Sequence, residues 1–118
     1  MAIEVKNEMG KISVDDEVIS TIAGISAMES YGIVGMAGKN ARDGLFELLR
    51  KDYMSKGVNV DSNGEEMNID LHVVLQFGVK ISVVAANIME HVKFAVENLC
   101  GVKVNKVNVL VQGIRVER

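Results

Sequence analysis

Two strands joined by a tight turn can be recognised in residues 58–77, which read VNVDSNGEEMNIDLHVVLQF. Asn63-Gly64 is typical of a type I′ hairpin turn, because both central positions of that turn need a positive φ. Placing this dipeptide at the tip gives a register that pairs Ser62 with Glu65, Val60 with Met67 and Val58 with Ile69. The apolar pairs then fall on one face, so the turn chemistry and the apolar alternation agree.

A long helix and a last strand follow this hairpin. Residues 80–99 carry apolar side chains three and four positions apart, and Gly101 is well suited to end the helix. The predicted stripe consists of Ile81, Val84, Ala85, Ile88, Val92, Ala95, Val96 and Leu99. Residues 102–116 form the strand, and its apolar alternation changes phase at Gly113, which indicates a β-bulge.

The sequence before the hairpin predicts strands and helices in alternation. Short strand signals occupy residues 3–5 and 12–14, and a helix follows over residues 15–31. The apolar face of this helix is predicted to hold Val18, Ile19, Ile22, Ile25 and Ser26. A buried strand within residues 32–38 then leads to a second helix, which Asn40 caps and which ends by Gly57.

The whole order is therefore β-α-β-α-β-β-α-β. It predicts a two-layer α+β fold in which one mainly antiparallel or mixed sheet carries helices on a single face. A chain of 118 residues and 12.8 kDa suits one domain, so we assign residues 1–118 to a single domain. Hydrophobic residues at 48% and charged residues at 25% exclude wholesale disorder.

The composition also limits which cellular compartment and which kinds of partner we expect. A single cysteine indicates a reducing environment, and the sequence carries neither a secretion signal nor an apolar run of about 18 residues. We therefore expect a cytoplasmic protein that reaches a membrane only indirectly. The formal charge of −3 argues against nucleic acid as a partner. Charge is uneven, since residues 58–77 hold four acids and no basic side chain.

Residue types that carry catalysis or bind metals are not grouped in the sequence. His72, His91 and Cys100 lack the spacing of a metal site. Nine residues of helix would place Cys100 about 13 Å along the axis from His91, on the opposite side, so the two cannot form a nucleophilic pair. Glu29 is interpreted as a structural carboxylate bonded to nearby backbone N–H groups. We predict no catalytic residue, no metal and no cofactor.

A candidate anion site lies where the second helix should begin. Gly38, Lys39, Asn40 and Arg42 combine basic side chains with the free N–H groups of a helix start. This leaves open a small module that binds an anion or an acyl phosphate. A weaker alternative is an RNA-binding domain, because the glycine spacing resembles a GxxG loop, although its intervening residues are apolar.

A candidate interface lies on the long helix. Val83 and Phe94 project from the side opposite the main apolar stripe, three turns apart. They are either scattered surface residues or part of a helix that packs on both sides, against the sheet and against a partner. This predicts self-association through that helix face.

Several long stretches together resemble a known family. They are GKISVDDEVISTIAG (10–24), YGIVGMAGKN (31–40), DGLFELLRKD (43–52), KGVNV (56–60), LHVVLQFGVKISVVAANI (71–88) and VNVLVQGIRV (107–116). In this order they resemble the bacterial alkaline shock protein (envelope stress response) family, in particular its YloU-like branch. Glu29 matches a frequent acidic residue of the family, and the long charged tails of other branches are lacking.

The resemblance implies a non-enzymatic accessory or scaffold protein of envelope stress and homeostasis. It implies self-association into a homo-oligomer and contact with protein partners, among them a membrane-anchored protein. The YloU-like branch is encoded beside a fatty-acid kinase-like protein, which implies a link to envelope-lipid metabolism. The family brings no established catalytic or binding residues.

Overall fold

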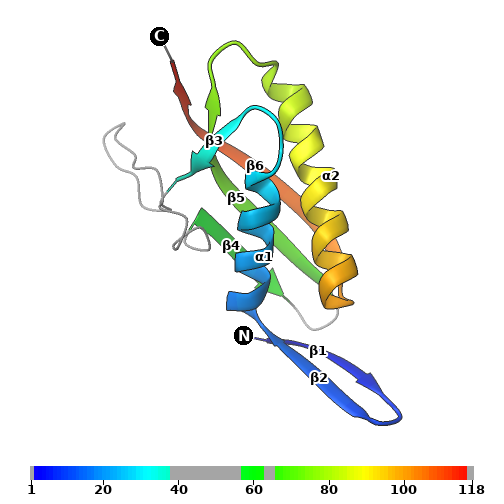
Figure 1. Cartoon of the computed structure of the whole chain (residues 1–118). Coiled ribbons are helices and arrows are strands. Elements are labelled where there is room, and N and C mark those ends of the chain that lie inside the picture. The colour runs from blue at the N-terminus through cyan, green and yellow to red at the C-terminus, as the bar shows by residue number, and fades with distance from the viewer. Residues whose placement is uncertain (1, 38–56, 63–65, 117–118) are drawn as a thin grey trace.

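The computed structural model describes residues 2–37, 57–62 and 66–116 (Figure 1). Its elements are β1 (Ala2–Asn7), β2 (Gly10–Asp15), α1 (Asp16–Met28), β3 (Ile33–Met36), β4 (Val58–Ser62), β5 (Glu66–Gln76), α2 (Ile81–Cys100) and β6 (Lys103–Arg115). The predicted α+β class and the order of these elements are confirmed. The helix predicted over residues 40–57 lies, except for its last residue, outside the described residues.

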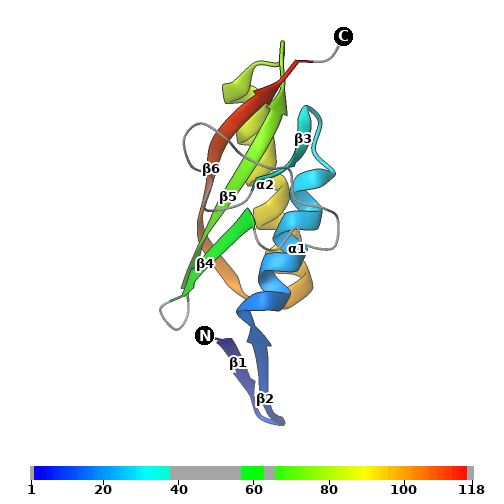
Figure 2. The ribbon, with the colours of Figure 1, turned by 90° about the vertical axis from the view of Figure 1, so that its left-hand side faces the viewer.

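The main sheet has four strands and is built around β5. β3 and β4 both pair with β5 in antiparallel fashion, whereas β6 pairs with it in parallel along its whole length. α1 and α2 pack against each other on one face of this sheet, as the edge-on view makes clear (Figure 2). The predicted mixed sheet with helices on a single face is therefore confirmed for the described elements.

The first two strands form a separate hairpin. Among the described strands, β1 and β2 pair only with each other, and they project from the end of the body near the start of α1 (Figure 1). Ile3 at the root of the hairpin is buried in the core, whereas Ile12 nearer its tip is exposed. The hairpin contributes to the elongated shape, which measures 56 × 26 × 21 Å along its principal axes.

The register predicted for the β4–β5 hairpin is wrong by two residues. Val60 lies opposite Ile69, and Val58 lies opposite Leu71, in place of the pairs predicted with Met67 and Ile69. Ser62 pairs with Met67, so the connection is longer than the two-residue turn expected from Asn63-Gly64. Because side chains alternate with a period of two, the shift leaves the same residues on the core face.

The last strand keeps its apolar residues on the helix side by means of two irregularities. Val73 pairs with Val111 and Val74 with Gly113, so Gln112 is an extra residue and the predicted β-bulge is confirmed. A second irregularity lies earlier, where Asn105 is the extra residue. Each adds one residue and resets the alternation. Val107, after the first, is buried in the core, whereas Ile114, after the second, lies opposite Leu75 and is 38% exposed.

The apolar faces of the two helices differ from those predicted. On α1, Ile19 and Ser26 are buried as expected, but Val18 and Ile25 are exposed. Small residues complete the buried side instead, namely Ser20, Ala23, Gly24 and Ala27. They let the backbone of α1 approach its neighbours closely, because the distance between packed elements depends on the side chains at the contact.

On α2 the predicted stripe is confirmed at its centre and wrong at its ends. The fully buried residues are Val84, Ile88, Val92 and Val96, whereas Ile81 and Leu99 are exposed. The helix ends as predicted at Gly101, which takes a left-handed conformation. A side chain of α2 also fixes the following turn, because the Glu97 carboxylate accepts a hydrogen bond from Val104 N–H at 3.0 Å.

Candidate functional site

The histidines and the cysteine occupy separate places. His72 lies on β5, on the face away from the helices, and its Nδ1 donates to the Gly57 carbonyl oxygen at 3.2 Å. His91 lies on α2, and Cys100 is half-buried at the end of that helix. Burial raises the pKa of the Cys100 thiol above its ordinary value, because desolvation disfavours the thiolate. A thiol shifted in this direction is a weaker nucleophile at neutral pH.

Glu29 joins the two helices. Its Oε1 accepts a hydrogen bond from His91 Nε2 at 3.1 Å, and both side chains are exposed. Backbone N–H groups were predicted to bond this carboxylate, and this prediction is wrong, because the partner is the imidazole of His91. The two residues are 62 positions apart, and only the packing of α1 on α2 brings them together. An exposed pair of this kind contributes at most about 1 kcal/mol.

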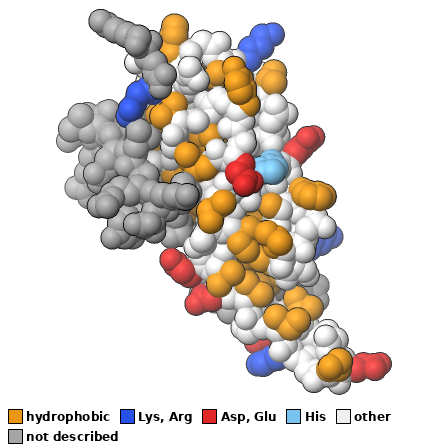
Figure 3. Space-filling model, in the orientation of Figure 1, with side chains coloured by type: hydrophobic (Ala, Val, Ile, Leu, Met, Phe, Trp, Pro, Cys, Tyr) orange, Lys and Arg blue, Asp and Glu red, His pale blue; other side chains and the backbone are white. Residues whose placement is uncertain are grey.

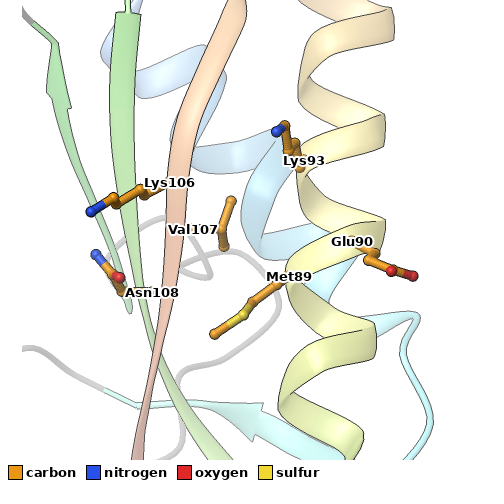
Figure 4. A pocket seen from close by; sticks show the side chains of 6 residues that line it. All are labelled: Met89, Glu90, Lys93, Lys106, Val107 and Asn108. Carbon is orange, nitrogen blue, oxygen red and sulfur yellow. The ribbon is translucent and has the colours of Figure 1, made fainter.

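A groove of about 360 Å³ lies between α2 and β6 (Figure 4). Met89 and Val107 point into it and form an apolar floor. The four polar residues of the lining do not converge (Figure 4). Lys93 and Glu90 lie on α2, and Glu90 points away from the groove, whereas Lys106 and Asn108 point to the other side of β6. Specific small-molecule sites need polar groups that converge on the ligand. This groove is therefore a poor candidate for catalysis.

Exposed apolar side chains lie on the outward side of the helix pair, together with the charged or polar Glu29, His91 and Glu90. Val18 and Ile25 lie on α1 opposite its buried side, and Val83 and Phe94 lie on α2 opposite its buried stripe. Both helices cover the same sheet face, so these four residues face the same way, and we call them the outer helix surface. Figure 3 shows apolar side chains over both helices and continuing onto the hairpin. A solvent-facing helix side is normally polar, so this surface is the candidate functional site.

The predicted interface residues thus lie on this surface. Phe94 is 67% exposed and Val83 is 51% exposed, as their helical phase predicted. The contribution of α1 was missed, because Val18 and Ile25 were assigned to the core. The signal that could have found it is the run of small residues at Ala23, Gly24 and Ala27, which favours close packing on that side.

The remaining predicted site is the candidate anion site. Gly38, Lys39, Asn40 and Arg42 lie outside the described residues, so the anion site stays a prediction. Within the part of the chain that is described, no helix is both long and apolar enough to cross a membrane.

Comparison with known proteins gives a family match over nearly the whole chain. The model of the alkaline shock protein 23 family, cell envelope-related function, matches residues 4–116. Protein YloU of Bacillus subtilis is 46% identical over 117 residues, which cover 98% of each chain. Protein Spy1614 of Streptococcus pyogenes is 44% identical over 117 residues, covering 98% of this chain and 97% of that one. A more distant relative is a stress response regulator gls24 homolog of S. pyogenes, 27% identical over 90% of this chain and 59% of its own.

Proposed function

Because the chain belongs to the alkaline shock protein 23 family, whose function is related to the cell envelope, we propose that it is a non-enzymatic accessory or scaffold protein of envelope homeostasis. It works as one domain over residues 1–118 and acts by self-association and by binding other proteins. The name of the gls24 relative, a stress response regulator, supports a role under stress. The protein is cytoplasmic in this proposal and reaches the membrane only through its partners.

The outer helix surface is the observation that carries this proposal. The four apolar residues of this surface, Val18, Ile25, Val83 and Phe94, are exposed to solvent on the side of each helix that is normally polar. Large aromatic side chains dominate the energetics of interfaces, and burying one stabilises a complex by about 2–3 kcal/mol. A surface formed by two rigid helices is also held in one arrangement before binding, which lowers the entropic cost of association.

The absence of enzymatic activity is part of the proposal. It is supported by the diverging polar groups of the groove between α2 and β6 and by the raised pKa of the Cys100 thiol. The Glu29–His91 pair is open to solvent, whereas catalytic pairs are usually held in a cleft.

The partners we propose are a second copy of this chain, a membrane-anchored protein and a fatty-acid kinase-like protein. The last of these would link the protein to envelope-lipid metabolism. The exposed apolar residues of the outer helix surface and the family together support all three, since the buried centre of a protein interface is largely apolar.

Capture from native cells tests this function. A tagged wild-type chain is recovered with and without nuclease treatment, beside the Val83→Asp/Phe94→Asp variant. The expected result is a nuclease-resistant set of membrane-anchored or lipid-metabolism proteins that the double variant loses, because two carboxylates would be buried without partners. Met9→Asp/Leu110→Asp is the matched control, since it places the same two charges on exposed apolar residues outside the outer helix surface.

Two outcomes would contradict the proposal. A nuclease-sensitive set of ribosomal proteins would favour the RNA-binding alternative. A set that the double variant retains in full would show that partners do not bind through the outer helix surface.

A further inference from the structure

A second exposed apolar cluster lies at the end of the molecule opposite the β1–β2 hairpin (Figure 1). Three segments meet there: the turn after α1, the turn between β5 and α2, and the end of strand β6. Gln76 N–H donates to the Gly32 carbonyl oxygen, and Phe77 N–H donates to the Arg115 carbonyl oxygen, both at 2.9 Å. These hydrogen bonds link the two turns to each other and to the end of β6. We call this end of the molecule the apex.

Aromatic and aliphatic side chains of the apex are exposed. Tyr31 is 82% exposed and Phe77 is 67% exposed, and both line a hollow of about 420 Å³ together with Val83. Ile81 and Val116 are also exposed at this end. Neither aromatic ring packs into the core, so folding of this chain does not explain their presence there.

The charged residues described at the hollow and at the end of β6 are basic. Lys80 lines the same hollow, and exposed Arg115 lies beside Phe77 through the backbone hydrogen bond. None of the described residues that line the hollow is acidic. Among the coloured side chains on the face drawn in Figure 3, the acidic ones lie lower down the molecule. The apex therefore combines apolar anchors with positive charge.

We propose that the apex docks directly on an anionic lipid surface. Aromatic side chains beside Lys and Arg are typical of segments that lie in the membrane interface. The exposed apolar and basic residues described at the apex are few compared with the roughly 20–30 residues that each partner contributes to a standard protein interface. A lipid surface needs only a few inserted side chains and cations, which the apex supplies.

This inference goes beyond the proposed function, in which the chain reaches the membrane only through other proteins. It also uses a different surface, apart from Val83, which lies at the border of both. The outer helix surface can therefore bind a partner while the apex touches lipid.

Flotation with vesicles tests the proposal. The full-length chain is mixed with vesicles of phosphatidylglycerol and phosphatidylcholine, and separately with vesicles of phosphatidylcholine alone. The wild type is expected to float with the anionic vesicles only. Phe77→Ser should lower the partition coefficient at least about fivefold because it removes an apolar anchor. Lys80→Gln/Arg115→Gln should lower it by about fivefold per cation and weaken its salt dependence.

Leu99→Ser is the matched control, because Leu99 is a large apolar side chain that is 72% exposed at the end of α2 away from the apex and is not part of the outer helix surface. Its flotation should equal that of the wild type. Circular dichroism melting of each variant separates lost binding from lost folding. Flotation in the presence of inorganic phosphate separates a lipid surface from a free anion, which should compete no better than chloride at equal ionic strength.

Three outcomes would overturn the proposal. The first is a wild type that fails to float with anionic vesicles, and the second is a Leu99→Ser variant that loses flotation as strongly as Phe77→Ser. The third is that Phe77→Ser leaves flotation unchanged and removes a captured protein, which would make the apex a protein interface. None of these results bears on self-association, which is measured without lipid.

Discussion

Gly32 lies where the turn after α1 passes close to α2. Its φ is +88°, and a Cβ built there would lie 3.1 Å from Val84 Cγ2 and 3.3 Å from Val79 Cγ1. Both the conformation and the space therefore require glycine. This single residue sets how closely the turn can approach the buried Val84 in the first turn of α2.

Gly32→Ala is expected to lower the free energy of unfolding by about 2–3 kcal/mol, from backbone strain plus the contact with Val84. Urea unfolding followed by circular dichroism measures it. Gly101→Ala is the control, because Gly101 has φ +70° but open space around it, so only the strain of about 1 kcal/mol remains. Equal losses in the two variants would rule out the close contact as a cause.

The Glu29–His91 hydrogen bond could not be predicted from the sequence around either residue. Glu29 could be placed at the end of its helix, but its partner lies 62 positions away. Only the packing of α1 on α2 creates that pair. Val83 and Phe94 were predictable because exposure on one helix follows from the 3.6-residue period of that helix alone.

At the scale of the element, the pairing of β6 with β5 depends on two extra residues in β6, Asn105 and Gln112. Deleting Gln112 removes the extra residue and leaves the pairs Val73–Val111 and Val74–Gly113 intact. The free energy of unfolding should therefore fall by no more than about 1 kcal/mol. Deleting Asn108, an exposed residue of the regular ladder opposite Asp70, moves Val109 and Val111 to the other face.

For the Asn108 deletion we expect a loss of more than about 2 kcal/mol, because apolar side chains leave the core. Chemical denaturation of the two deletion variants measures the difference. If both deletions cost the same, Gln112 is not the residue that resets the alternation.

The packing of α1 gives a second test at this scale. Ala23 is fully buried, so Ala23→Leu should lower the free energy of unfolding by about 1–3 kcal/mol through overpacking. Ile25→Ala should change it by no more than about 0.5 kcal/mol, since Ile25 is exposed. Thermal or urea unfolding distinguishes them. The reverse ranking would mean that Ile25 faces the core.

These elements explain what the sequence could and could not predict. The bulge at Gly113 was visible as a break in the apolar alternation, and the same break between Val104 and Val107 marks the missed one at Asn105. The face of α1 could not be fixed by apolar periodicity, because its buried side is made of small residues that carry little hydrophobic signal. The β4–β5 register could not be fixed either, because shifts by two preserve the pattern.

At the scale of the whole molecule, the two helices place their apolar sides both inward and outward. The inward sides build the core with β5 and β6, and the outward sides form the outer helix surface. Sequence periodicity predicted the part on α2, whereas the part on α1 follows only from the assembled layers. A helix layer with two apolar sides is the structural basis of the proposed scaffold role.

Sedimentation velocity over a range of concentrations tests that claim most directly. The wild-type chain should sediment with an average mass above the 12.8 kDa of one chain and rising with concentration, while Val83→Asp/Phe94→Asp should remain at 12.8 kDa. A wild type that stays at 12.8 kDa throughout, or a double variant that associates as the wild type does, would contradict the account.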